Sequence, residues 1–91
     1  MYIDITPNQF IDLIKILAVR IKENGASLER HGDHKDDIII FIYKKNNMTR
    51  VIARIHKYNP NKQNKNLEKI YQIDDRLFKY SIISTEDMKT F

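Results

Sequence analysis

The first 25 residues carry the feature that most constrains the fold, a complete set of signals for one amphipathic helix. Thr6 is a candidate N-cap, Pro7 takes the first helical position, and Gln9 stands where a capping box needs it. Gly25 can end the helix, because glycine accepts a left-handed backbone. The apolar residues between these signals recur at helical spacing: Phe10, Leu13, Ile14, Leu17, Ala18 and Ile21. The sequence therefore predicts a helix over residues 7–24 with one apolar face.

After this helix the spacing of apolar residues changes to the period of a β-strand. The segments "ASLERH", "DIIIFIY" and "MTRVIARIHKY" are predicted to form three strands of a meander. Asn46 and Asn47 suit a tight hairpin turn between the last two strands, because asparagine tolerates a positive φ. Strict alternation along the last strand predicts two faces: Val51, Ala53 and Ile55 on one, and Arg50, Ile52, Arg54 and His56 on the other.

A second helix is predicted after the polar segment "NPNKQNKN". Asn66 can cap this helix, and Asp74 falls on its apolar side. Its apolar stripe would comprise Leu67, Ile70, Tyr71, Leu77 and Phe78. The last segment, "SIISTEDMKTF", predicts either a strand or a short helix that Ser84 caps, with Asp87 three residues further on.

The order of these elements predicts a single small α+β domain. We expect an α-β-β-β-α arrangement, with a three-stranded antiparallel sheet and both helices packed on one face. A chain of 91 residues is long enough for one domain and too short for two. We therefore assign residues 1–91 to one domain, with its core in 7–80 and a closing segment in 81–91.

The composition excludes several classes of protein. The chain has no cysteine, which rules out a disulfide scaffold, a thiolate zinc site and a cysteine nucleophile. No apolar run approaches the ~20 residues of a membrane span, and Asp4 and Asp12 interrupt any N-terminal signal, so we expect a cytoplasmic protein. The net charge of +4 favours a nucleic-acid partner.

Two of the three histidines lie in the motif "HGDH". His31 and His34 flank Gly32, and the plain interpretation is an exposed turn that uses the backbone freedom of glycine. The neighbouring Asp33 and Asp36 do not complete any known zinc spacing, so we expect no metal. The functional interpretation is acid–base cleavage of RNA, whose own 2′-OH is the nucleophile. Histidine can take or give a proton near neutral pH, and no cofactor is needed.

The order of elements and three short motifs resemble the HicA toxins, small messenger-RNA interferases with a double-stranded-RNA-binding-like fold. The similar segments are "ENG" at the helix end, "GDH" before the second strand, and "RVIARIHKY" followed by a polar loop. The resemblance implies that His34 stands at the position of the family's catalytic histidine. It also implies RNA as the substrate and a protein antitoxin as a partner.

The candidate site residues fall into two groups. The catalytic candidates are His34 and His56, the second as a further proton-transfer or phosphate-binding group. The nucleic-acid contacts are expected from Arg30, Arg50, Arg54, Lys57 and Lys62.

Two alternatives to an RNA-cleaving domain stay open. Asp33, Asp36 and Asp37 put three carboxylates beside the predicted site, where they would repel a phosphate. The chain could instead be a non-catalytic viral or plasmid protein that inhibits a host nucleoprotein, as anti-CRISPR proteins do. It could also be a plain nucleic-acid-binding module, with salt-dependent affinity and no dependence on His34.

Overall fold

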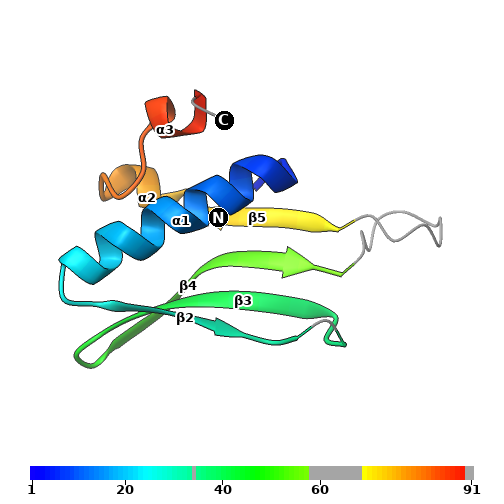
Figure 1. Cartoon of the computed structure of the whole chain (residues 1–91), viewed down its shortest axis with the longest axis horizontal. Helices are drawn as coiled ribbons and strands as arrows, with labels where there is room; N and C mark the ends of the chain where they lie inside the picture. The colour runs from blue at the N-terminus through cyan, green and yellow to red at the C-terminus, as the bar shows by residue number, and fades with distance from the viewer. Residues whose placement is uncertain (34, 58–68, 90–91) are drawn as a thin grey trace.

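The computed structural model describes residues 1–33, 35–57 and 69–89, which form an antiparallel sheet covered on one side by helices (Figure 1). The five strands are β1 (Tyr2–Ile5), β2 (Ser27–His31), β3 (Ile38–Lys45), β4 (Met48–His56) and β5 (Ile70–Asp74). Their order in the sheet is β1-β5-β4-β3-β2, and every neighbouring pair is antiparallel. The helices are α1 (Pro7–Glu23), α2 (Arg76–Lys79) and α3 (Thr85–Lys89).

The predicted first helix is confirmed in its start, its end and most of its buried face. Thr6 Oγ1 accepts a hydrogen bond from the Gln9 backbone N–H at 3.2 Å, and Gln9 Oε1 accepts one from Thr6 N–H at 3.0 Å. This capping box satisfies two of the N–H groups that a helix start leaves without partners. The buried residues of α1 are Phe10, Leu13, Leu17 and Ile21. Ala18, predicted on the same stripe, is exposed instead.

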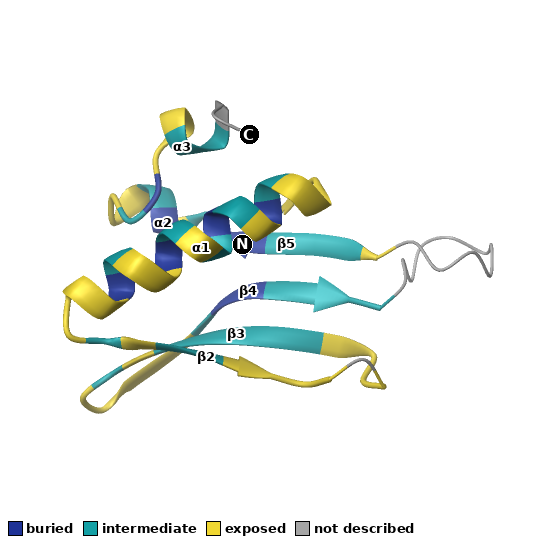
Figure 2. Cartoon of the chain, in the orientation of Figure 1, coloured by how far each residue is buried: buried dark blue, intermediate teal, exposed yellow. Residues whose placement is uncertain are grey.

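The core lies between α1 and the face of the sheet that it covers. The Phe10 ring packs against Phe41 of β3 and Tyr71 of β5, with ring centres 5.5 and 5.2 Å apart. Ala53 of β4 and Ile73 of β5 are fully buried beneath the helix layer. Figure 2 shows the buried segments gathered where α1, α2 and the sheet meet. Truncating a fully buried leucine such as Leu17 to alanine would cost about 2–5 kcal/mol, because it leaves a cavity.

The expected three-stranded sheet and α-β-β-β-α order are wrong, because two strands were not foreseen. β1 precedes α1 and pairs with β5, and β5 occupies a segment that was predicted as helix. In "IYQID" the alternation puts Tyr71 and Ile73 on the helix-covered face, whereas Gln72 lies on the other. β5 is followed closely by the short α2, and together they space the apolar residues as one long helix would. For this reason the sequence predicted a helix where β5 lies. The predicted cap Asn66 and Leu67 lie outside the described residues.

A β-bulge in β4 corrects the prediction of which residues share a face. Phe41 pairs with Ala53 but the next residue, Ile42, pairs with Val51, so Ile52 is an extra residue in the ladder. The bulge interrupts the alternation of β4. The helix-covered face carries Arg50, Ile52, Ala53 and Ile55, and the opposite face carries Val51, Arg54 and His56. Arg50 and Arg54, predicted to lie on one face, are therefore on opposite faces.

The closing segment forms the short helix that was one of its two predicted conformations. Ser84 caps α3: its Oγ accepts a hydrogen bond from Asp87 N–H at 3.1 Å. Asp87 also binds the Arg20 guanidinium of α1 through both carboxylate oxygens, at 2.9 and 3.1 Å. Arg20 donates further to the Ile82 carbonyl, and Ile83 next to it is fully buried in the core. Arg20 therefore ties the end of the chain to the helix layer.

We expect the Asp87→Asn variant to lose stability at neutral pH and to lose less as the pH falls. The hydrogen bonds from Arg20 and Ser84 lower the pKa of Asp87 from 3.8 to about 2. A lowered pKa stabilises the folded state above pH 3.8, and this contribution disappears as the pH falls through about 2. Arg20 is partly exposed and water screens the pair, so we expect a loss of about 1 kcal/mol. Urea unfolding at pH 6 and pH 2 measures it.

The control is Asp12→Asn, which removes a carboxylate of α1 and leaves Asp87 of α3 in place. If Asp87→Asn destabilises the protein equally at both pH values, the ionic part of the contact with Arg20 is refuted.

Candidate functional site

The sheet face opposite α1 carries no helix in the described part of the chain, and the strand register gathers polar side chains on it. Asp4 of β1 pairs with Gln72 of β5, and Gln72 pairs with Arg54 of β4. His56 stands two residues beyond Arg54 and therefore lies on the same face. We call this surface the open face.

A chain of hydrogen bonds on the open face orients His56. His56 Nε2 lies 2.8 Å from Gln72 Oε1, and Gln72 Nε2 donates to Asp4 Oδ1 at 2.9 Å. An ionised carboxylate only accepts, so the amide nitrogen of Gln72 faces Asp4 and its oxygen faces His56. Because that oxygen also only accepts, Nε2 is the ring nitrogen of His56 that donates in this contact. Nδ1 is then the nitrogen that can accept a proton.

Arg54 lies beside this chain, with its guanidinium over an aromatic ring. Its guanidinium carbon is 4.3 Å from the centre of the Tyr2 ring, within the range of a cation–π contact. The Tyr2 hydroxyl donates to the Val51 carbonyl at the bulge, at 2.8 Å. Arg54 Nε is buried and, among the described residues, has no hydrogen-bond partner. The stack therefore places a positive charge in a fixed position near His56.

The turn between β2 and β3 lies next to the end of β4 that carries His56. Lys57 N–H donates to the Asp37 carbonyl at 2.8 Å, which joins the turn to β4. Asp33 and Asp36, two of the three carboxylates that could repel a phosphate, accept hydrogen bonds from backbone N–H groups within this turn. Asp36 Oδ2 accepts from Asp33 N–H at 2.7 Å, and Asp33 Oδ1 accepts from Lys35 N–H at 2.7 Å.

The predicted site residues are divided between the two faces. His56 and Arg54 lie together on the open face, and Lys57 follows them at the turn. Arg30 pairs with Phe41, whose side chain packs on α1, so Arg30 lies on the helix-covered face together with Arg50. The remaining two, His34 and Lys62, lie outside the described residues.

Tyr2, Asp4 and Gln72 are site residues that the sequence analysis missed. Each alternates with apolar neighbours in a short segment, "YIDI" for the first two and "IYQID" for the third. This period of two was the signal that could have identified them as strand residues facing away from the core.

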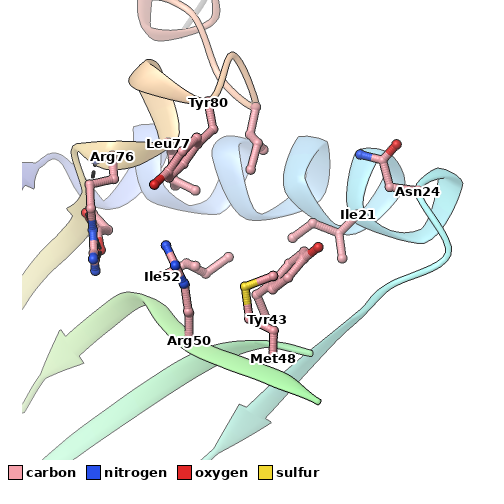
Figure 3. Close-up of a pocket in the computed structure, with 11 residues that line it drawn as sticks. Ile21, Asn24, Tyr43, Met48, Arg50, Ile52, Arg76, Leu77 and Tyr80 are labelled. Atoms are coloured by element: carbon pink, nitrogen blue, oxygen red, sulfur yellow. Dashed lines mark hydrogen bonds and ion pairs between the residues drawn. The ribbon is translucent and has the colours of Figure 1, made fainter. Parts of the chain in front are cut away.

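Arg50 faces a cavity of about 360 Å³ between α1, α2 and the sheet (Figure 3). Its guanidinium carbon is 5.9 Å from the centre of the Tyr80 ring. Across the cavity, Arg76 Nε donates to both oxygens of the buried Asp74 carboxylate, at 3.0 and 2.9 Å. Burial raises the pKa of Asp74, but the hydrogen bonds and charge of Arg76 outweigh it and hold the pKa below 3.8.

The described residues contain no group of three or more histidine, cysteine or acidic side chains that could hold a metal ion. Within the same residues, no helix has the length and apolar character needed to cross a membrane. Comparison with protein-family models, curated proteins and solved structures finds no match to this chain. The resemblance to the HicA toxins therefore stays a prediction.

We expect Gly32→Ala to destabilise the protein more than Gly25→Ala does. Both glycines have a positive φ, +104° at Gly32 and +74° at Gly25, so each substitution costs about 1–2 kcal/mol of backbone strain. A Cβ at Gly32 would also lie 2.9 Å from the Ile38 carbonyl oxygen, whereas one at Gly25 meets no atom within 4 Å. Urea unfolding of both variants measures the difference. Equal losses would show that the close approach at Gly32 carries no cost.

Proposed function

We propose that this protein binds RNA on its open face and cleaves it with His56 as an acid–base group. The observation that carries the proposal is the Asp4–Gln72–His56 hydrogen-bond chain. A histidine that serves only as a turn or packing residue does not need two further side chains to fix its orientation. A proton-transfer group does, because the accepting nitrogen must be aimed at the reacting atom.

The chemistry follows from Nδ1 of His56, the ring nitrogen that does not contact Gln72. This nitrogen would take the proton of an RNA 2′-OH, and the oxygen would then attack the neighbouring phosphorus. The bond from phosphorus to the 5′-oxygen breaks, and a second group must protonate that leaving oxygen. His34 is the predicted candidate for this acid, and it lies outside the described residues. Arg54 would stabilise the charge that builds up on the phosphate oxygens.

The acidic turn is compatible with this proposal. The Asp33 and Asp36 carboxylates accept hydrogen bonds from backbone N–H groups of their own turn, which offsets part of their negative charge. The proposal does not require a divalent cation.

A second candidate function is a non-catalytic protein that docks on a host nucleoprotein. The observation that favours it is the apolar part of the open face, where Ile38, Ile40 and Ile42 of β3 alternate with the covered residues. All three side chains keep some exposure, with Ile38 at 37 %. An apolar row on an uncovered sheet is typical of a protein-binding surface.

We expect the wild-type protein to cleave a single-stranded RNA in the presence of EDTA, and His56→Ala to lower the rate at least about 100-fold. Gln72→Met keeps the size of the side chain but removes the hydrogen bond, and we expect a loss of about tenfold from poorer orientation. Gel analysis of labelled RNA gives the rates. A DNA of the same sequence is the matched substrate, because it lacks the 2′-OH and must stay intact.

His31→Ala, purified in the same way, is the matched control, since His31 is an exposed histidine at the edge of the open face. Equal cleavage by His56→Ala and wild type would refute the catalytic role and point to a contaminating nuclease. RNA binding without cleavage would support the open face as an RNA-binding surface and would refute cleavage by His56. A ribonuclease-resistant complex with a host protein, lost in Ile40→Lys but not in His56→Ala, would establish the second candidate.

A further inference from the structure

The cavity between α1, α2 and the sheet is a second candidate site, and its lining residues differ from those of the open face. Its lining is mainly apolar, with contributions from Ile21 of α1, Ile52 of β4 and Leu77 of α2. Polar groups converge on this lining from several elements: Asn24, Tyr43, Arg50, Arg76 and Tyr80. A concave apolar cavity with a few convergent polar groups is the usual form of a small-molecule site. None of these residues belongs to the open face.

The described side chains that line the cavity carry more positive than negative charge. Arg76 binds the buried Asp74 carboxylate through Nε and Nη2, so this pair is neutral as a unit. Arg50 has no carboxylate partner within the described residues and contacts the Tyr80 ring instead. The hydrogen bond that Arg50 makes with the Tyr80 phenol lowers the pKa of that hydroxyl. The cavity therefore holds one uncompensated positive charge.

In Figure 3, Arg50 points from β4 toward Tyr80 across the cavity. Ile52 and Leu77 lie beside it, so a ligand that reaches the guanidinium also touches apolar surface. The bulge at Ile52 produces this arrangement, because without it Arg50 would face the other side of the sheet. An arginine among apolar side chains favours a ligand with one charged end and one apolar end.

We propose that this cavity binds a small organic monocarboxylate with an apolar or aromatic body. The guanidinium of Arg50 would bind both carboxylate oxygens, which is the geometry that arginine favours. The body would lie against Ile21, Ile52 and Leu77. A volume of about 360 Å³ suits a molecule built on one or two rings.

The single free charge argues against a phosphate monoester. A phosphate monoester carries nearly two negative charges at neutral pH. The Asp74 carboxylate on the cavity wall is balanced by Arg76, and only Arg50 remains to offset a ligand's charge. A monoanion matches that one charge, whereas a dianion leaves one negative charge without a cationic partner among the described lining residues.

The test uses 3-phenylpropionate as the probe and 3-phenylpropionamide as its neutral analogue. Titrations followed by two-dimensional amide NMR locate the binding site and give both affinities. We expect shifts at the residues that line the cavity, and an affinity at least about tenfold higher for the acid than for the amide. In Arg50→Gln this preference is expected to disappear. Arg30→Gln is the matched control, since Arg30 lies on the same sheet face but outside the cavity lining.

Two further variants keep the test decisive if Arg50→Gln does not fold. Arg50→Lys keeps the charge but loses the two-pronged geometry, so we expect it to bind the acid more weakly than wild type. Tyr80→Phe removes the phenol that competes for Arg50 but keeps the ring, so we expect it to bind the acid at least as tightly.

The proposal fails if acid and amide bind equally, if neither binds at millimolar concentration, or if the shifts map to the open face. Tighter binding of inorganic phosphate than of the acid would also overturn it, because the site would then select a dianion. Displacement of the acid by a single-stranded RNA would assign the cavity to nucleic acid instead. None of these outcomes depends on whether His56 cleaves RNA.

Discussion

The packing of α1 on the sheet is the interaction on which the rest of the structure depends. Phe10 sits between Phe41 and Tyr71, and in this way one helix side chain joins β3 to β5 across β4. The other buried residues of α1 continue this contact along the covered face. Because this layer supplies most of the core, the open face is free to carry polar side chains without a large loss of stability. The two faces of the sheet therefore differ in character: one forms the core and the other carries polar side chains.

The bulge in β4 gives each face its own arginine. Arg50 lies at the cavity on the helix-covered face, where it stays exposed, and Arg54 lies on the open face against Tyr2. Without the extra residue Ile52, both would occupy one face and one of the two sites would lack its cation. A one-residue irregularity therefore places one arginine in the proposed RNA-binding surface and the other in the proposed ligand cavity. The residues that line the cavity are different from those of the hydrogen-bond chain on the open face.

The parts of the fold that sequence analysis predicted are those whose signals are local. The capping box, the apolar stripe and the glycine of α1 all lie within one stretch of chain, and so do Asn46 and the two strands that it joins. β5 was mistaken for helix because its five residues are too few to establish a period, and α2 extends the apolar spacing. The bulge could not be predicted, because the pairing of β4 with β3 determines it. His56 was a predicted site residue, and the residues that orient it, Gln72 and Asp4, come from strands that the sequence analysis did not predict.

The pairing of β1 with β5 joins the first strand of the chain to the last one. Tyr2 lies opposite Asp74, and the Met1 carbonyl accepts a hydrogen bond from Asp75 N–H. During synthesis on a ribosome, α1 and the β2–β4 meander can emerge and begin to collapse while β1 has no partner. Ile3 and Ile5 cannot pair with the residues of β5 until β5 leaves the exit tunnel, and they stay exposed until then. The Asp4–Gln72–His56 chain of hydrogen bonds forms only at that moment, so a nascent chain that ends before β5 carries His56 without the glutamine that orients it.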